Sequence, residues 1–107
     1  MADEYRLLYV TAGTKDEALT IADALIEEHL VACANIIDGV MSVYRWEGKV
    51  QHDQEAVLIA KTAMSRLDAA IRRVRELHSY DCPCIVAIPI EDGNPAFLEW
   101  ISRNISS

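Results

Sequence analysis

The chain has 107 residues, of which 51% are hydrophobic and 25% charged, a balance typical of one globular domain, so we expect a single domain over residues 1–107. A formal net charge of -7 argues against a nucleic acid partner, because binding phosphates depends on clustered Lys and Arg. No apolar run approaches the roughly 18 to 20 residues that a membrane span requires. The N-terminus, M-A-D-E-Y-R, carries acids where a signal peptide carries bases, and we therefore expect a soluble, cytoplasmic protein without a membrane partner.

The first predicted elements are a strand and a helix. Residues 5–11 are rich in β-forming residues and nearly continuous in apolar character, which is typical of a central strand. Thr14 and Glu17 form a T-x-x-E capping box, and apolar residues then recur every three or four positions up to residue 26. This pattern predicts a helix that packs on a sheet and ends near residues 29–30.

Residues 30–62 are the most informative part of the sequence, because they predict two long strands around a tight turn at residues 47–49. A mean strand has about 5 to 6 residues, and each arm here is roughly twice as long. The pair Asp38-Gly39 suits a β-bulge or a local kink in the first arm. So long a hairpin cannot be covered by the rest of the chain, and its far end is expected to need a partner, most economically a second copy.

The remaining residues predict a helix, a strand and a final helix. Ser65 with Asp68 is expected to open the helix, residues 78–83 form a loop, and residues 84–90 form an apolar strand. Asn94 followed by Pro95 is a strong helix start signal. The order of elements predicts an α+β protein with the ferredoxin-like split β-α-β fold, a long hairpin between its second and third strands, and an appended C-terminal helix.

Thiol and imidazole groups are the candidate metal ligands. His78, Cys82 and Cys84 lie within seven residues, and such groups suit Cu(I) and Zn(II). Their spacing matches no closed zinc signature, and the alternative is a helix-capping histidine with two packed cysteines. Cys33 lies among small apolar residues, where a packed thiol is the alternative to a functional one. An odd number of cysteines without a secretion signal predicts reduced thiols.

A second candidate set consists of polar-tipped aromatic residues and two charged ones. The aromatic residues can either pack in the core or an interface, or stack on a ligand. The charged residues can either form ion pairs at the surface or belong to a buried site between subunits. The set is Tyr44, Trp46, Tyr80, Trp100, Glu55 and Lys61. The sequence has no G-x-G-x-x-G, P-loop, H-E-x-x-H or G-x-S-x-G motif, and we expect no enzyme activity.

Five ordered blocks cover essentially the whole chain: L-V-A-C-A-N-I at 30–36, S-V-Y-R-W-E-G-K at 42–49, E-A-V-L-I-A-K-T at 55–62, H-S-Y-D-C-P at 78–83 and F-L-E-W-I at 97–101. In these blocks the sequence resembles the CutA divalent-cation-tolerance family. The resemblance implies a ferredoxin-like protomer in a tight homotrimer, located in the bacterial cytoplasm and linked to tolerance of copper and other divalent metals. Our leading interpretation is a protein that binds copper or another divalent ion weakly, without catalysis and without an organic cofactor. Similarity to PII-type signalling trimers is implied at the level of fold.

The sequence departs from the family pattern at the expected metal ligands. The family's loop commonly reads H-P-Y-x-x-P-E, whereas this chain has Ser79 and Cys84 at the Pro and Glu positions. Some copper-linked members carry a cysteine where this chain has Val10, and a His-His pair where it has Leu77 and His78. Cys33 matches the family's A-C block. The resulting hypothesis is a metal site among His78, Cys33, Cys82 and Cys84, in which the last two supply compensating soft ligands. The alternative is a PII-like small-molecule sensor or a partner-binding trimer, with clefts between subunits lined by the aromatic and charged set.

Overall fold

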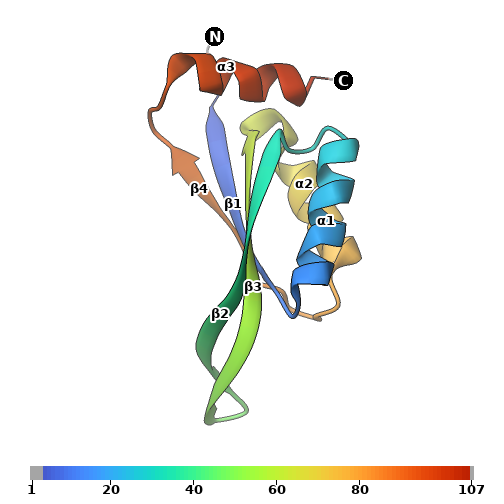
Figure 1. Ribbon diagram of the computed structural model, residues 1–107, viewed down its shortest axis with the longest axis vertical. Helices are drawn as coiled ribbons and strands as arrows, with labels where there is room; N and C mark the ends of the chain where they lie inside the picture. Colours follow the sequence, from blue (N-terminus) through green and yellow to red (C-terminus); the bar gives the residue numbers. More distant parts are fainter. Residues whose placement is uncertain (1–3, 107) are drawn as a thin grey trace.

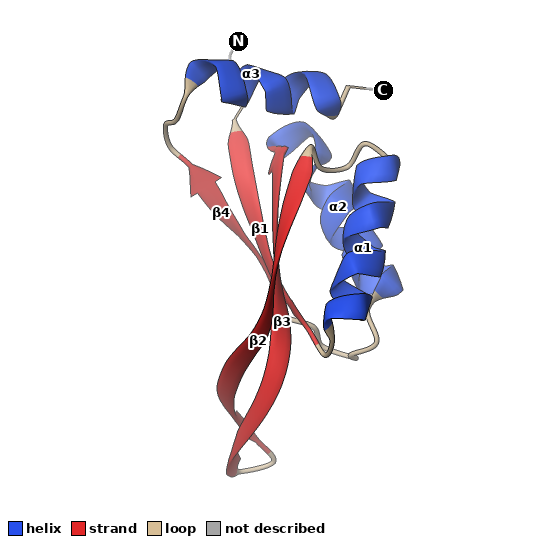
Figure 2. Cartoon of the chain, viewed as in Figure 1, coloured by secondary structure: helices blue, strands red, loops and turns tan. Residues whose placement is uncertain are grey.

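A computed structural model describes residues 4–106 of the chain. Four strands form one antiparallel sheet in the order β2-β3-β1-β4, and three helices accompany it (Figures 1 and 2). The elements are β1 (Tyr5–Ala12), α1 (Lys15–Glu27), β2 (Cys33–Trp46), β3 (Lys49–Ala63), α2 (Met64–Leu77), β4 (Ile85–Ile90) and α3 (Pro95–Asn104). This arrangement confirms the predicted ferredoxin-like fold with an appended helix.

Residues 1–3, which hold part of the acidic N-terminus, and residue 107 lie outside the described residues. Among the helices within residues 4–106, none is both long and apolar enough to cross a membrane.

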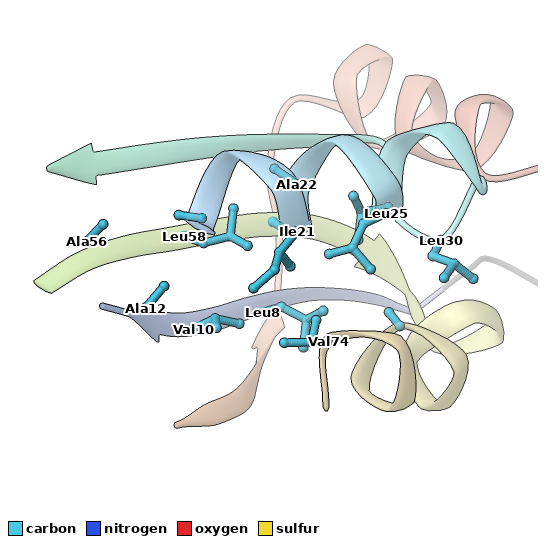
Figure 3. Close-up of a cluster of buried hydrophobic side chains, with 14 of the residues drawn as sticks. Leu8, Val10, Ala12, Ile21, Ala22, Leu25, Leu30, Ala56, Leu58 and Val74 are labelled. Atoms are coloured by element: carbon cyan, nitrogen blue, oxygen red, sulfur yellow. The ribbon is translucent and has the colours of Figure 1, made fainter. Parts of the chain in front are cut away.

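Helices α1 and α2 cover one face of the sheet, and the main core lies between them and the strands (Figures 1 and 3). Its largest fully buried side chains come from β1, β3, both helices and the segment between α1 and β2, namely Leu8, Val10, Leu58, Ile21, Leu25, Val74 and Val31. Helix α3 lies across one end of the sheet, where Ile101 and Ile105 pack with Ala32 and Ala63. The other face of the sheet carries exposed apolar side chains, including Val86 at 48% exposure.

The helix starts show where local sequence signals held and where they failed. The Thr14 hydroxyl accepts a hydrogen bond from the Glu17 N–H at 3.1 Å, as the capping box predicts. The Glu17 carboxylate accepts from the N–H of Gly13, one residue before the cap, at 3.2 Å. The predicted opening of α2 at Ser65 is wrong, because β3 runs straight into the helix and the N-cap is Ala63. The N–H of Met64 instead donates to the Glu4 carbonyl at 2.8 Å.

The hairpin is as long as its sequence predicts, with 14 residues in β2 and 15 in β3. Glu47 and Gly48 form its turn with φ values of 50° and 77°, the left-handed pair typical of a type I′ turn. Lys49, expected in the turn, instead pairs with Trp46. The predicted bulge is confirmed by the register shift between Ile37 and Val40, where Gly39 has a φ of 71°.

The hairpin projects away from the helices and the rest of the sheet (Figure 1). The tip of the hairpin exposes apolar side chains on both of its faces. Trp46 lies on one face and is 62% exposed, and Val43 and Val50 are exposed on the opposite face. Contiguous exposed apolar surface of this kind marks interaction sites in soluble proteins.

Candidate functional site

A pocket of about 640 Å³ lies between the hairpin and the segment that joins α2 to β4. We call it the hairpin pocket. Its lining residues are Thr11, Ser42, Tyr44, Trp46, Glu55, Tyr80, Asp81, Cys82 and Cys84. It therefore brings together four of the six residues expected in a cleft and two of the four expected at a metal site.

The hairpin supplies one wall through strand alternation. Ser42, Tyr44 and Trp46 are spaced two apart on β2, so their side chains point to the same face of the sheet. Glu55 joins them from the neighbouring strand β3. The Tyr44 hydroxyl donates a hydrogen bond to Asp53, and this bond raises the pKa of Tyr44. This wall thus presents two aromatic side chains, and the hydroxyl of one of them, Tyr44, meets a carboxylate.

The loop after α2 supplies the opposite wall, and Tyr80 ties it to the hairpin. Its hydroxyl donates to Glu55 Oε2 at 2.9 Å, which joins two residues that are 25 positions apart in the sequence. Partial burial and the bond to Glu55 raise the pKa of Tyr80 to about 12, so the phenol stays protonated at neutral pH. A Cβ at Gly13 would lie 3.3 Å from this hydroxyl, so the approach of the loop depends on a small residue there.

His78 supports the loop from behind. Its side chain is fully buried, Nε2 donates to the Thr11 carbonyl at 2.7 Å, and Nδ1 accepts from the Tyr80 N–H at 3.1 Å. Because Thr11 offers only an acceptor and Tyr80 only a donor, these bonds place the proton on Nε2. The imidazole ring also contacts the Tyr80 ring, with centroids 4.7 Å apart. His78 would become a metal ligand only after losing one of these bonds.

Glu17 anchors the same loop to the start of α1. Its Oε2 accepts from the Ser79 N–H at 2.8 Å, while Oε1 accepts from the N–H of Gly13. Burial alone would raise the pKa of Glu17, but the hydrogen bonds from Ser79 and Gly13 outweigh it and lower the pKa. The sequence showed Glu17 only as a capping residue, and nothing local indicated its bond to a loop 62 residues away.

The structure separates the predicted metal ligands. Cys82 and Cys84 are exposed and line the pocket, whereas Cys33 is half-buried at the start of β2, where it pairs with Lys61. All three are free thiols. Within residues 4–106, no group of three or more His, Cys, Asp or Glu side chains is placed to hold a metal ion. One protomer therefore offers two neighbouring thiols in one pocket rather than the four-member set.

Two predicted cleft residues lie outside the pocket. The Lys61 ammonium group donates to Asn35 on β2, and Trp100 stacks on Phe97 in α3 with ring centroids 5.5 Å apart. Conversely, the sequence did not single out Thr11, Ser42 or Asp81 as lining residues. Ser42 alone carried a usable signal, because it alternates with Tyr44 and Trp46 along the strand.

Known proteins match nearly the full length of this chain. The family model of the CutA1 divalent ion tolerance protein matches residues 6–104. The chain is 46% identical over 98 residues to "Protein CutA 1, chloroplastic" of Oryza sativa. The match covers 92% of this chain and 55% of that protein, so this chain spans about half the length of that relative. It is 44% identical to the "Divalent-cation tolerance protein CutA" of Thermus thermophilus, covering 92% and 95% of the two chains. The crystal structure of the divalent ion tolerance protein CutA1 from Ehrlichia chaffeensis matches with a TM-score of 0.95 and 32% identity over the whole of both chains. The chain belongs to the CutA1 divalent ion tolerance protein family.

Proposed function

We propose that this chain is a non-enzymatic, cytoplasmic protein of divalent metal tolerance, which binds copper or another metal ion weakly as cargo in the hairpin pocket. The observation that carries the proposal is the pair of exposed thiols, Cys82 and Cys84, lining one pocket with the carboxylates of Glu55 and Asp81. Thiolates favour soft ions, copper among them. The pair also replaces the ligand pattern that the sequence lacks at Val10 and Leu77.

The small number of metal ligands in the pocket limits its affinity for a metal ion. A closed zinc site takes four ligands, and no group of even three ligands is assembled within residues 4–106. Two thiolates from one chain satisfy a soft ion only in part, and the pocket carboxylates are harder oxygen donors. Weak, exchangeable binding therefore fits this protomer better than a permanent structural metal.

The direct test is titration of Cu(I), Cu(II) and Zn(II) into the metal-free protein and into a Cys82→Ser/Cys84→Ser double variant. We expect the double variant to lose the binding, and the matched control Cys33→Ser, a thiol outside the pocket, to keep it. Unchanged affinity in the double variant would reject the thiol site. A His78→Ala variant reports separately on the histidine, which holds Tyr80 in place here.

We further propose that the working unit is a homotrimer. The support is the exposed apolar surface on the sheet face opposite the helices, with Ile37, Val86 and Ile88, together with the hairpin tip. Strands β2 and β4 are the sheet edges, where unpaired backbone groups can add strands from another copy. Sedimentation should give three times the chain mass of 12.0 kDa, and a stable species at the mass of one chain would contradict the proposal.

A small-molecule sensor is the second candidate function, and the wall of the hairpin pocket favours it. Three aromatic side chains contribute to the lining of this pocket, whose volume lies within the range of about 300–1,000 Å³ usual for ligand sites. A thermal-shift screen with small metabolites tests it, because a ligand that binds only the folded state raises the unfolding midpoint. The absence of any shift at saturating concentrations would reject it.

A further inference from the structure

Three aromatic side chains contribute to the lining of the hairpin pocket within one protomer. Tyr44 and Trp46 come from β2, and Tyr80 comes from the loop after α2, so the rings approach the pocket from two segments. Within residues 4–106, no aromatic ring stacks on Tyr44 or Trp46, and Tyr80 contacts His78.

Hydrogen bonds to carboxylates make two of the three rings richer in electrons. The hydroxyls of Tyr44 and Tyr80 each donate to a carboxylate, Asp53 and Glu55 respectively. Donation to an anion adds electron density to a phenol ring, and the face of such a ring attracts cations. These bonds also use the hydroxyl protons, so neither hydroxyl has a free proton to donate to a ligand.

The charges in the pocket have one sign. Glu55 and Asp81 line it, and no Lys, Arg or His of the described residues does so. The whole chain carries a formal net charge of -7. Phosphate-bearing ligands such as nucleotides would meet two carboxylates and no cation there, which disfavours them. A cation would gain both the ring faces and the carboxylates.

We propose that the hairpin pocket binds an organic cation of the methylated or quaternary ammonium class, enclosed by Tyr44, Trp46 and Tyr80 and balanced by Glu55 and Asp81. An alkylated ammonium has the apolar surface that the aromatic walls require, and it is weakly hydrated, so it loses little on entering the pocket. The inference rests on the second candidate function above, because it names the class of small molecule that the pocket takes.

The test compares tetramethylammonium with 2,2-dimethylpropan-1-ol, an uncharged molecule of similar shape, at constant ionic strength. Proton NMR of the ligand methyl groups reports binding, since protons over aromatic rings shift upfield. We expect tetramethylammonium to bind at least about tenfold more tightly, as a partly desolvated cation–π contact predicts. Equal affinities, or no tetramethylammonium binding at all, would overturn the proposal, and this comparison needs no variant.

Three variants locate the binding. Trp46→Leu should weaken tetramethylammonium binding about tenfold, because it keeps apolar bulk but removes the ring. The matched control Trp100→Leu, on α3 outside the pocket, should leave the affinity unchanged. Glu55→Gln keeps an oxygen that can accept from Tyr80 but removes the charge, and it should reduce both the affinity and its salt dependence. Unchanged binding in Trp46→Leu, or an equal loss in Trp100→Leu, would contradict the assignment.

Failure of this inference differs from failure of the proposed functions. If an uncharged or anionic metabolite raises the unfolding midpoint while tetramethylammonium does not, the sensor function stands and the cationic ligand class is rejected. Metal titration is independent of both outcomes, because the Cys82→Ser/Cys84→Ser variant keeps every aromatic ring of the pocket.

Discussion

Glu17→Ala should destabilise the protein by detaching the pocket loop from α1. The carboxylate accepts from Ser79 at 2.8 Å and from Gly13 at 3.2 Å, and it lies 3.9 Å from His78 Nδ1. A hydrogen bond to a charged group contributes about 1.5–3 kcal/mol. Because Ser79 is exposed and water can replace part of the interaction, we expect the two bonds together to contribute about 2 kcal/mol.

The matched control is Glu27→Ala, the same substitution at an exposed position of the same helix. Urea denaturation at one protein concentration compares the two variants with the wild type. We expect Glu27→Ala to stay within about 0.5 kcal/mol of wild type, as is usual for surface substitutions. Equal free energies of unfolding for the two variants would refute the loop-anchoring role of Glu17.

The same carboxylate gives a pH dependence with a defined sign. Its folded pKa lies below the ordinary value of 4.5, so its contribution is fully present above pH 4.5 and is lost as pH falls through the folded pKa. The wild type should therefore lose stability below pH 4.5 more steeply than Glu17→Ala. Parallel pH profiles for the two proteins would show that the lowered pKa has no energetic consequence.

Three further predictions concern the core, the assembly and Tyr80. Leu58→Ala removes a fully buried side chain from β3 and should cost about 2–5 kcal/mol in urea denaturation. Val86→Asp places a charge on the open sheet face and should dissociate the proposed trimer in sedimentation, while Leu19→Asp, a similarly exposed position on α1, should not. For Tyr80 the folded pKa of about 12 exceeds the ordinary 10.0, so its contribution is present below pH 10 and is lost between pH 10 and 12. A phenolate absorbance titration against Tyr80→Phe should assign the latest-ionising tyrosine to this residue.

The sequence signals that succeeded are those in which neighbouring residues determine the backbone. Asp38-Gly39 marks the bulge because glycine adopts the left-handed conformation there, and Thr14 caps α1 through a hydrogen bond three residues away. The prediction of the start of α2 failed because a tertiary contact takes the place of a side-chain cap. The N–H of Met64 donates a hydrogen bond to the carbonyl of Glu4, 60 positions away. No local pattern encodes such a partner.

The site was harder to predict because proximity in sequence does not imply a shared direction. The short spacing of His78, Cys82 and Cys84 in the sequence suggested one metal site. In the structure the imidazole forms a hydrogen bond with the backbone of β1, while the two cysteines line the pocket. The bond between Tyr80 and Glu55 depends on β1 pairing with β3 on one side and β4 on the other, which brings the loop before β4 near the hairpin. That register is fixed by the whole sheet.

The thiols and the aromatic rings share one pocket, and this has a consequence for both proposed ligands. Glu55 would balance an organic cation and could also contact a metal held at Cys82 and Cys84. Two positive charges in one small pocket repel each other, so each ligand should lower the affinity for the other by the same factor. We expect saturating Cu(I) to weaken tetramethylammonium binding, measured by ligand NMR, and to lose this effect in Cys82→Ser/Cys84→Ser. Binding of tetramethylammonium that is unaffected by Cu(I) in the wild type would show that the two ligands do not share the pocket.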